Sequence, residues 1–257
     1  MIIVALRTRT LVMAGGAALV SLALTGCGAD PSDAPADHKS FALSGKTLTI
    51  DAGNSAIELV PADVKSVQVT RRVDGWVFLG NGPHATWSMR DDTLSLKLKC
   101  TAIISDCEAR HQIKVPRGVS VVLTDDNGSV SASGFHSALK LRSSNGKVTV
   151  HDSSGALDLS SNNGSVNAYG VSSRQVRADS DNGSVRLSLA AVPDQVESVS
   201  DNGSIDVTLP KKPGLAYKVE TRSGNGSTKV SVPTDDASGH RVSARSDNGK
   251  VTVRSAN

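Results

Sequence analysis

The sequence has few aromatic residues: phenylalanine, tryptophan and tyrosine together make up 3% of its 257 positions. A core must therefore be built from valine, leucine, isoleucine and alanine, which favours thin, regular layers over a bulky globular interior. Neither sign of charge dominates, with 28 basic and 25 acidic residues. This balance gives no reason to expect a nucleic-acid partner.

Long apolar runs are also missing, apart from residues 11–24. Arg7 and Arg9 precede this run, which is too short for a comfortable membrane-spanning helix. The run ends in Leu-Thr-Gly-Cys at 24–27, which resembles the lipobox of bacterial lipoproteins. The resemblance implies a lipoprotein signal peptide over residues 1–26 and lipid, palmitate included, on Cys27. An ordinary secretory signal is the alternative.

Cysteine is scarce, with three residues in all. If Cys27 carries lipid, Cys100 and Cys107 remain as a pair that an oxidising extracytoplasmic compartment would join in a disulfide. No set of histidines and cysteines has metal-ligand spacing, so we expect no metal and no cofactor. The six histidines are scattered, and we interpret them as surface residues.

Residues 28–40 contain two prolines and almost no large apolar groups. We therefore predict that residues 27–45 are the lipidated cysteine and a disordered tether. Residues 46–257 form a single domain. Within it, the Gly- and Pro-containing stretch 74–84 and the stretch between the two cysteines are predicted to be loops. Trp76, Phe78 and Trp87 are expected to form a small cluster that anchors this insertion, with a sugar-stacking patch as the alternative.

Asn-Gly pairs are abundant and recur every 18 to 23 residues through the second half of the chain. Their asparagines are Asn127, Asn145, Asn163, Asn182, Asn202, Asn225 and Asn248. An eighth copy in the same register surrounds Asn54, where the glycine comes before the asparagine instead of after it. A period of this length is the signature of a repeat architecture.

Each copy shares one pattern around its asparagine. Apolar residues recur at alternate positions, six and four before it and three and five after it, which predicts two half-buried strands on either side of a tight turn. Serine stands two positions before the asparagine in six of the seven Asn-Gly copies. The glycine is expected to supply a positive φ angle at the turn.

Two architectures fit this alternation: a β-solenoid and an antiparallel hairpin meander, since Asn-Gly is also a strong hairpin signal. A meander has no need of serine at a fixed position, whereas stacked coils would align equivalent side chains into ladders. The residues five positions before the asparagine largely alternate in charge, as in Lys140, Asp158, Arg177 and Glu197. We therefore predict an all-β, single-domain solenoid of about 8–10 coils, with the corner asparagines pointing inward in a ladder.

Together these features resemble the bacterial putative-adhesin β-strand-repeat lipoproteins, a domain of unknown function. The resemblance rests on the lipobox, the Pro-containing tether, the cysteine pair, the Val-Pro-Arg-Gly turn at 115–118 and the tandem Ser-x-Asn-Gly units. It implies a β-helix-like solenoid. It carries over no catalytic or binding residues.

Enzyme chemistry has little support in the residues. Asp126, Asp181, Asp201 and Asp247 precede corner asparagines, where aspartate stabilises turns, and the repeat pattern of calcium β-rolls is absent. We predict a non-catalytic cell-envelope protein, anchored by lipid to the outer face of the cell membrane, that presents a rigid surface to an unidentified glycan or protein. The alternative is a carbohydrate-active β-helix, a polysaccharide lyase or hydrolase.

Overall fold

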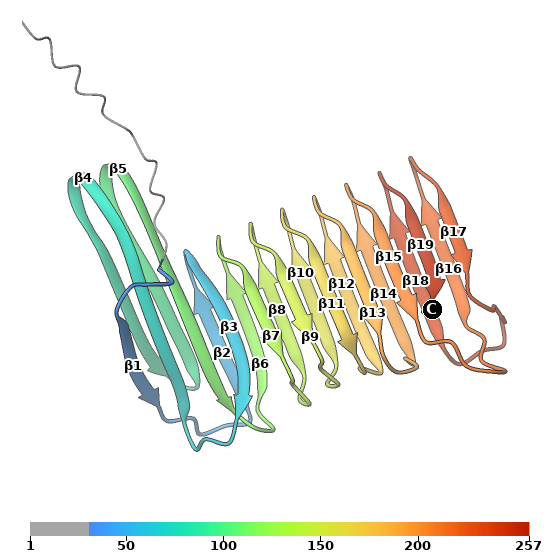
Figure 1. Cartoon of the computed structure of the whole chain (residues 1–257), viewed down its shortest axis with the longest axis horizontal. Helices are drawn as coiled ribbons and strands as arrows, with labels where there is room; N and C mark the ends of the chain where they lie inside the picture. Colours follow the sequence, from blue (N-terminus) through green and yellow to red (C-terminus); the bar gives the residue numbers. More distant parts are fainter. Residues whose placement is uncertain (1–30, 257) are drawn as a thin grey trace, which may run out of the picture.

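The computed structural model describes residues 31–256, and their regular structure consists entirely of β-strands (Figure 1). Cys27 and the signal segment 1–26 lie outside the described residues. The predicted all-β solenoid is confirmed. Each coil contributes one strand to each of two parallel layers, and the apolar side chains of both layers meet between them.

The first layer contains the strands that precede the corner asparagines. In spatial order they are β2 (Thr47–Ala52), β6 (Ser120–Asp125), β8 (Leu139–Ser143), β10 (Leu157–Ser161), β12 (Gln175–Ser180), β14 (Gln195–Ser200), β18 (Arg241–Ser246) and β16 (Lys218–Ser223). The second layer contains the strands that follow them: β3 (Ser55–Ala62), β7 (Val130–Ser133), β9 (Val148–His151), β11 (Val166–Val171), β13 (Val185–Leu189), β15 (Ile205–Leu209), β19 (Val251–Ser255) and β17 (Thr228–Ser231). The eight coils lie within the predicted range.

The register between coils follows the repeat. Leu139 pairs with Leu157, and Leu157 pairs with Val176, so equivalent positions lie directly above one another. These side chains are buried, as are those four positions before the asparagine, such as Leu141 and Leu159. The outward residues between them stay partly exposed, which produces the alternating burial that the sequence pattern predicts.

The last two coils are exchanged in space relative to their order in the chain. Strands β18 and β19 lie between the coil of β14 and β15 and the coil of β16 and β17 (Figure 1). The coil that ends the stack is therefore residues 218–231, and all four residues of β17 are exposed. The exchange also places Ser243 between Glu197 and Glu220, so these two like charges are not neighbours.

A long bent ribbon covers the other end of the stack. β4 (Val67–Arg90) and β5 (Thr93–Pro116) pair antiparallel along almost their whole length. The first part of β5 pairs with β2 and the last part pairs with β3, so this one strand adds a rung to both layers. β1 (Ala36–Phe41) then pairs antiparallel with β4.

This end of the molecule corrects two predictions. Residues 36–41 belong to β1 and are not disordered tether, because Phe41 is buried and their backbone pairs with residues 67–72. The stretches 74–84 and 100–107 are strand and not loop, because each supplies the other with backbone partners across the ribbon. Gly and Pro residues interrupt the pattern there without ending the strands.

Candidate functional site

The asparagine corners form one continuous ladder along the solenoid. Seven side-chain hydrogen bonds of 2.6–3.0 Å join the eight asparagines, each Nδ2 donating to the Oδ1 of the neighbouring coil. In spatial order the ladder runs through Asn54, Asn127, Asn145, Asn163, Asn182, Asn202, Asn248 and Asn225. The prediction that these side chains point inward is wrong, because all eight are exposed on the outside of the corner.

The serines two positions before each asparagine occupy the inside of the corner. Ser161, for example, donates its hydroxyl hydrogen bond to the carbonyl of Gly146 in the preceding coil, and its oxygen accepts from the amide of Gly164 in its own coil, both at 2.8 Å. The same bond to the preceding coil recurs at Ser143, Ser180, Ser200, Ser246 and Ser223. The serine ladder therefore holds successive coils together from within.

The glycines of the corners allow neighbouring coils to pack closely. None of the seven Asn-Gly glycines is among the residues with positive φ in the described chain, so the predicted turn conformation is wrong. A Cβ on any of them would lie well under 3.0 Å from a backbone carbonyl of the neighbouring coil. Glycine is required here because the coils stack so closely, and not because the turn is left-handed.

The first full repeat departs from the serine pattern at Asp125. Its Oδ2 accepts a hydrogen bond from the amide of Gly128, as the hydroxyl oxygen of serine does in the later coils. A carboxylate, however, has no hydrogen to donate to the preceding coil, that of Asn54. The other carboxylate oxygen, Oδ1, is buried without a hydrogen-bond partner in the described structure. Burial raises the pKa of Asp125 to about 7.

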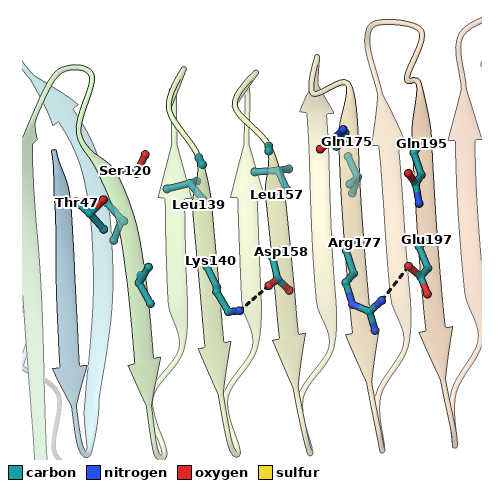
Figure 2. A pocket seen from close by; sticks show the side chains of 15 residues that line it. Thr47, Ser120, Leu139, Lys140, Leu157, Asp158, Gln175, Arg177, Gln195 and Glu197 are labelled. Atoms are coloured by element: carbon teal, nitrogen blue, oxygen red, sulfur yellow. Dashed lines mark ion pairs between the residues drawn. The ribbon is translucent and has the colours of Figure 1, made fainter.

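A shallow groove of about 430 Å³ crosses the outer face of the first layer, at right angles to the strands (Figure 2). Its floor includes Ala138 and Ala156, two exposed small residues in neighbouring coils. Along its length the charged residues pair between coils. Lys140 binds Asp158 at 3.0 Å, and Arg177 binds Glu197 at 2.8 Å (Figure 2).

These pairs confirm the charge alternation and limit the chemistry of the groove. Arg177 also contacts Asp179 at 2.9 Å, so this one guanidinium holds carboxylates from two strands. A glycosidic general acid needs a carboxyl group in surroundings that keep it protonated, whereas Asp158 and Glu197 are both held by cations. The groove is thus lined largely by apolar side chains, with ion pairs of balanced charge along it.

The apex of the β4–β5 ribbon is a second unusual surface. Five of the large hydrophobic residues that are exposed in the described chain lie on it: Trp76, Phe78, Leu79, Ile103 and Ile104. The cluster predicted from Trp76, Phe78 and Trp87 does not form. Trp87 instead packs near the core, with Phe41 and the guanidinium of Arg71, while Trp76 and Phe78 face outward.

The disulfide between Cys100 and Cys107 brackets the apex, with 6.6 Å between the two Cα atoms. Both residues belong to β5, so the bond joins the rising and descending parts of one bent strand. The sequence pattern predicts a loop for this pair and singles out Trp76 and Phe78, but it does not identify Leu79, Ile103 and Ile104 as exposed.

His111 corrects the prediction that all histidines are at the surface. It is 2% exposed, on β5 between Ile57 and Arg71, and neither ring nitrogen has a hydrogen-bond partner in the described structure. Burial, with a smaller effect of the Arg71 charge, lowers its pKa to about 4. It is enclosed in the capping end of the solenoid.

The described part of the chain contains neither a metal cluster nor a spanning helix. No group of three or more His, Cys, Asp or Glu side chains able to hold a metal ion occurs within residues 31–256. Over the same residues, no helix has the length and apolar character needed to cross a membrane.

The geometry defines a class of protein: a two-layer parallel β-solenoid held together by polar corner ladders. Residues 87–256 match the family model described as Toastrack DUF4097. This segment is well over half of the chain, and the chain therefore belongs to the Toastrack family. No curated protein matches the chain in sequence.

A solved structure agrees with this fold. A putative adhesin from Parabacteroides distasonis ATCC 8503 is 12% identical, with a TM-score of 0.50 over 87% of this chain and 98% of that one. A putative adhesin from Bacteroides fragilis NCTC 9343 is 16% identical, with a TM-score of 0.38 over 88% and 99%. At these identities the likeness concerns the fold alone.

Proposed function

We propose that this chain is a non-catalytic cell-envelope protein, tethered by lipid on Cys27 to the outer face of the membrane, whose solenoid binds an extended envelope polymer. The observation that carries the proposal is the groove, a surface of apolar side chains and paired charges that runs across the first layer from Thr47 on β2 to Glu197 on β14. Five strand spacings of ~4.8 Å would give it a length of roughly 24 Å. That suits an elongated chain better than a compact metabolite.

Rigidity supports this role. The asparagine and serine ladders fix each coil against its neighbours, so the groove needs little ordering when it binds, and preorganised surfaces lose less entropy on association. Stability in such arrays is close to a sum of nearest-neighbour terms, which suits display of an extended surface. The adhesin names of the solved relatives agree with a binding role outside the cytoplasm.

The binding test uses mature protein with Cys27→Ser, which cannot take lipid, and isolated cell walls as the probe. We expect saturable binding without the appearance of new reducing ends. Ala156→Trp fills the floor of the groove and should abolish binding, while Thr149→Trp, on the outer face of the other layer, should leave it intact. New reducing ends that disappear in Asp158→Asn or Glu197→Gln would establish the carbohydrate-active alternative instead.

The anchor is tested separately. Mass spectrometry of the mature N-terminus from the native cell should detect diacylglyceryl-modified Cys27 after removal of residues 1–26. An unmodified cysteine, or cleavage at another position, would refute the anchor without bearing on the groove.

A further inference from the structure

The apex of the bent ribbon projects beyond the stack. In Figure 1, β4 and β5 extend past the corner of the neighbouring coil, formed by β2 and β3. At the bend, Phe78 pairs with Ile104, and the following residue, Leu79, has a φ of 51°. The backbone therefore turns at Leu79, and the disulfide lies at the base of the turned segment.

The apolar side chains of the apex point away from the core. Leu79 and Ile103, at the bend itself, are 69% and 77% exposed, and Phe78, Ile104 and Trp76 are each about half exposed. Soluble proteins rarely leave such a group of large apolar residues together in water, and its usual explanation is an interaction surface. Elsewhere in the described chain, exposed large hydrophobic residues stand singly, as Tyr169 and Val230 do.

The start of the described chain lies on the same side as the apex. Strand β1 runs with Ala36 opposite Arg72 and Phe41 opposite Val67, so its beginning is the end nearer to the apex. Cys27 lies nine positions before Ala36, and extended backbone of this length spans at most ~30 Å. The turn in which the Ala34 amide donates to the Pro31 carbonyl shortens this reach by a few ångströms. The six steps from Arg72 to Phe78 rise by roughly 20 Å as strand. Lipid on Cys27 and the apex can therefore reach the same bilayer surface.

We propose that the apex, Trp76, Phe78, Leu79, Ile103 and Ile104, inserts into the interfacial region of the lipid bilayer and acts as a second membrane contact. This rests on the proposed lipid anchor, because the length of chain between Cys27 and Ala36 is what selects a bilayer over other apolar partners. Tryptophan favours the membrane interface, and phenylalanine and leucine accompany it on the apolar faces of interfacial segments. Insertion stops at the interface, because the backbone groups at the bend need water or headgroup partners.

The charges below the apex balance. Across the ribbon Arg72 lies opposite Arg110, and Asp74 lies opposite Glu108. Nearer to the apex, Asp106 opposite Trp76 and Lys99 opposite His84 add one charge of each sign. Binding should therefore come from the apolar side chains, with similar affinity for phosphatidylcholine and phosphatidylglycerol vesicles and weak dependence on salt. Adsorption through charge would instead differ between the two lipids and weaken strongly as salt is added.

The two tryptophans permit a direct test. In mature Cys27→Ser protein, Trp87→Phe leaves Trp76 as the single tryptophan, and Trp76→Phe leaves Trp87. On phosphatidylcholine vesicles, the emission of Trp76 should shift to shorter wavelength and be quenched by brominated lipid. The emission of Trp87, which packs near the core, should stay unchanged and serves as the control.

Variants then locate the contact. The double substitution Phe78→Ser with Ile103→Ser should lower vesicle partitioning at least tenfold, and Val230→Ser, at the far end of the stack, should have no effect. Unchanged Trp76 emission at saturating vesicles would overturn the proposal. So would a shift that depends on protein concentration and not on lipid, which would make a second copy the occupant. Because Cys27 is absent from these samples, the result is independent of whether lipidation occurs.

Discussion

Gly164 packs directly against the backbone carbonyl of Gly146, its equivalent in the neighbouring coil. A Cβ atom at Gly164 would lie well under 3.0 Å from that oxygen, a distance that real Cβ atoms essentially never show. The obstacle is backbone, so a side chain cannot rotate to make room. The repeat distance between coils is thereby tied to the absence of a side chain at this position.

We predict that Gly164→Ala destabilises the solenoid by about 4 kcal/mol or more, because two coils must separate to admit one methyl group. Gly239→Ala is the control, since a Cβ at that glycine would have no other atom within 4 Å and its φ lies outside the left-handed region. Denaturant unfolding of both variants measures the difference. Equal stability of the two would show that the coils are packed less closely than the Gly164–Gly146 contact implies.

Asp125 gives a prediction about pH. Its folded pKa of about 7 lies above the ordinary value of 3.8, so folded protein binds a proton that unfolded protein releases between these pH values. Stability should therefore fall as pH rises from about 4 to 7, and the loss should be complete above pH 7. Protonated Asp125 can donate a hydrogen bond as the serines do, whereas the carboxylate cannot.

Asp125→Ser restores the hydroxyl and removes the charge. The variant should be more stable than the parent by about 2–4 kcal/mol at pH 8, and the advantage should shrink towards pH 4. Denaturant midpoints at the two pH values give the difference between variant and parent, in which other titrating groups largely cancel. An advantage that stays constant with pH, or grows as the pH falls, would contradict this role for Asp125.

His111 titrates in the opposite sense. Its folded pKa of about 4 lies below the ordinary 6.5, so unfolded protein takes up a proton first and stability is lost as pH falls from 6.5 to 4. His111→Leu should remove this loss, with an advantage of up to about 3 kcal/mol at pH 4. The same unfolding measurement at pH 4 and pH 7.5 checks it. A variant that follows the parent at both values would mean that His111 charges freely in the folded protein.

Much of the fold follows from the sequence, for a local reason. Each coil carries its own corner, with an asparagine and alternating apolar residues and, in every coil after that of Asn54, a serine or aspartate two positions earlier, so the stacked architecture can be predicted from neighbouring copies. The direction in which the asparagine side chains point cannot be predicted in this way. Both Asn163 and Ser161 can form ladders, and only the packing of the corner decides that serine takes the buried side.

The order of coils at the end of the stack is equally hard to predict. Every coil presents the same ladder groups to both of its neighbours. Asn248 can therefore bond with Asn202 and Asn225, and the ladder bonds do not favour chain order over the exchanged order. The capping ribbon is obscured for another reason. Its apex contains Gly75, Gly80, Gly82 and Pro83, which is the composition of a loop, although the residues on both sides of the bend pair as strands.

The central claim is that side-chain ladders at the corners hold the coils in register, and Asn163 and Asn162 test it within a single coil. Asn163 donates to Asn145 at 2.8 Å and accepts from Asn182 at 3.0 Å, whereas the side chain of Asn162, one position earlier, is exposed and lies outside the ladder. The measurement is the free energy of unfolding of Asn163→Ala against Asn162→Ala under identical conditions. We predict a loss of about 1–3 kcal/mol for Asn163→Ala and little change for Asn162→Ala. Equal losses, or none in either variant, would contradict the claim.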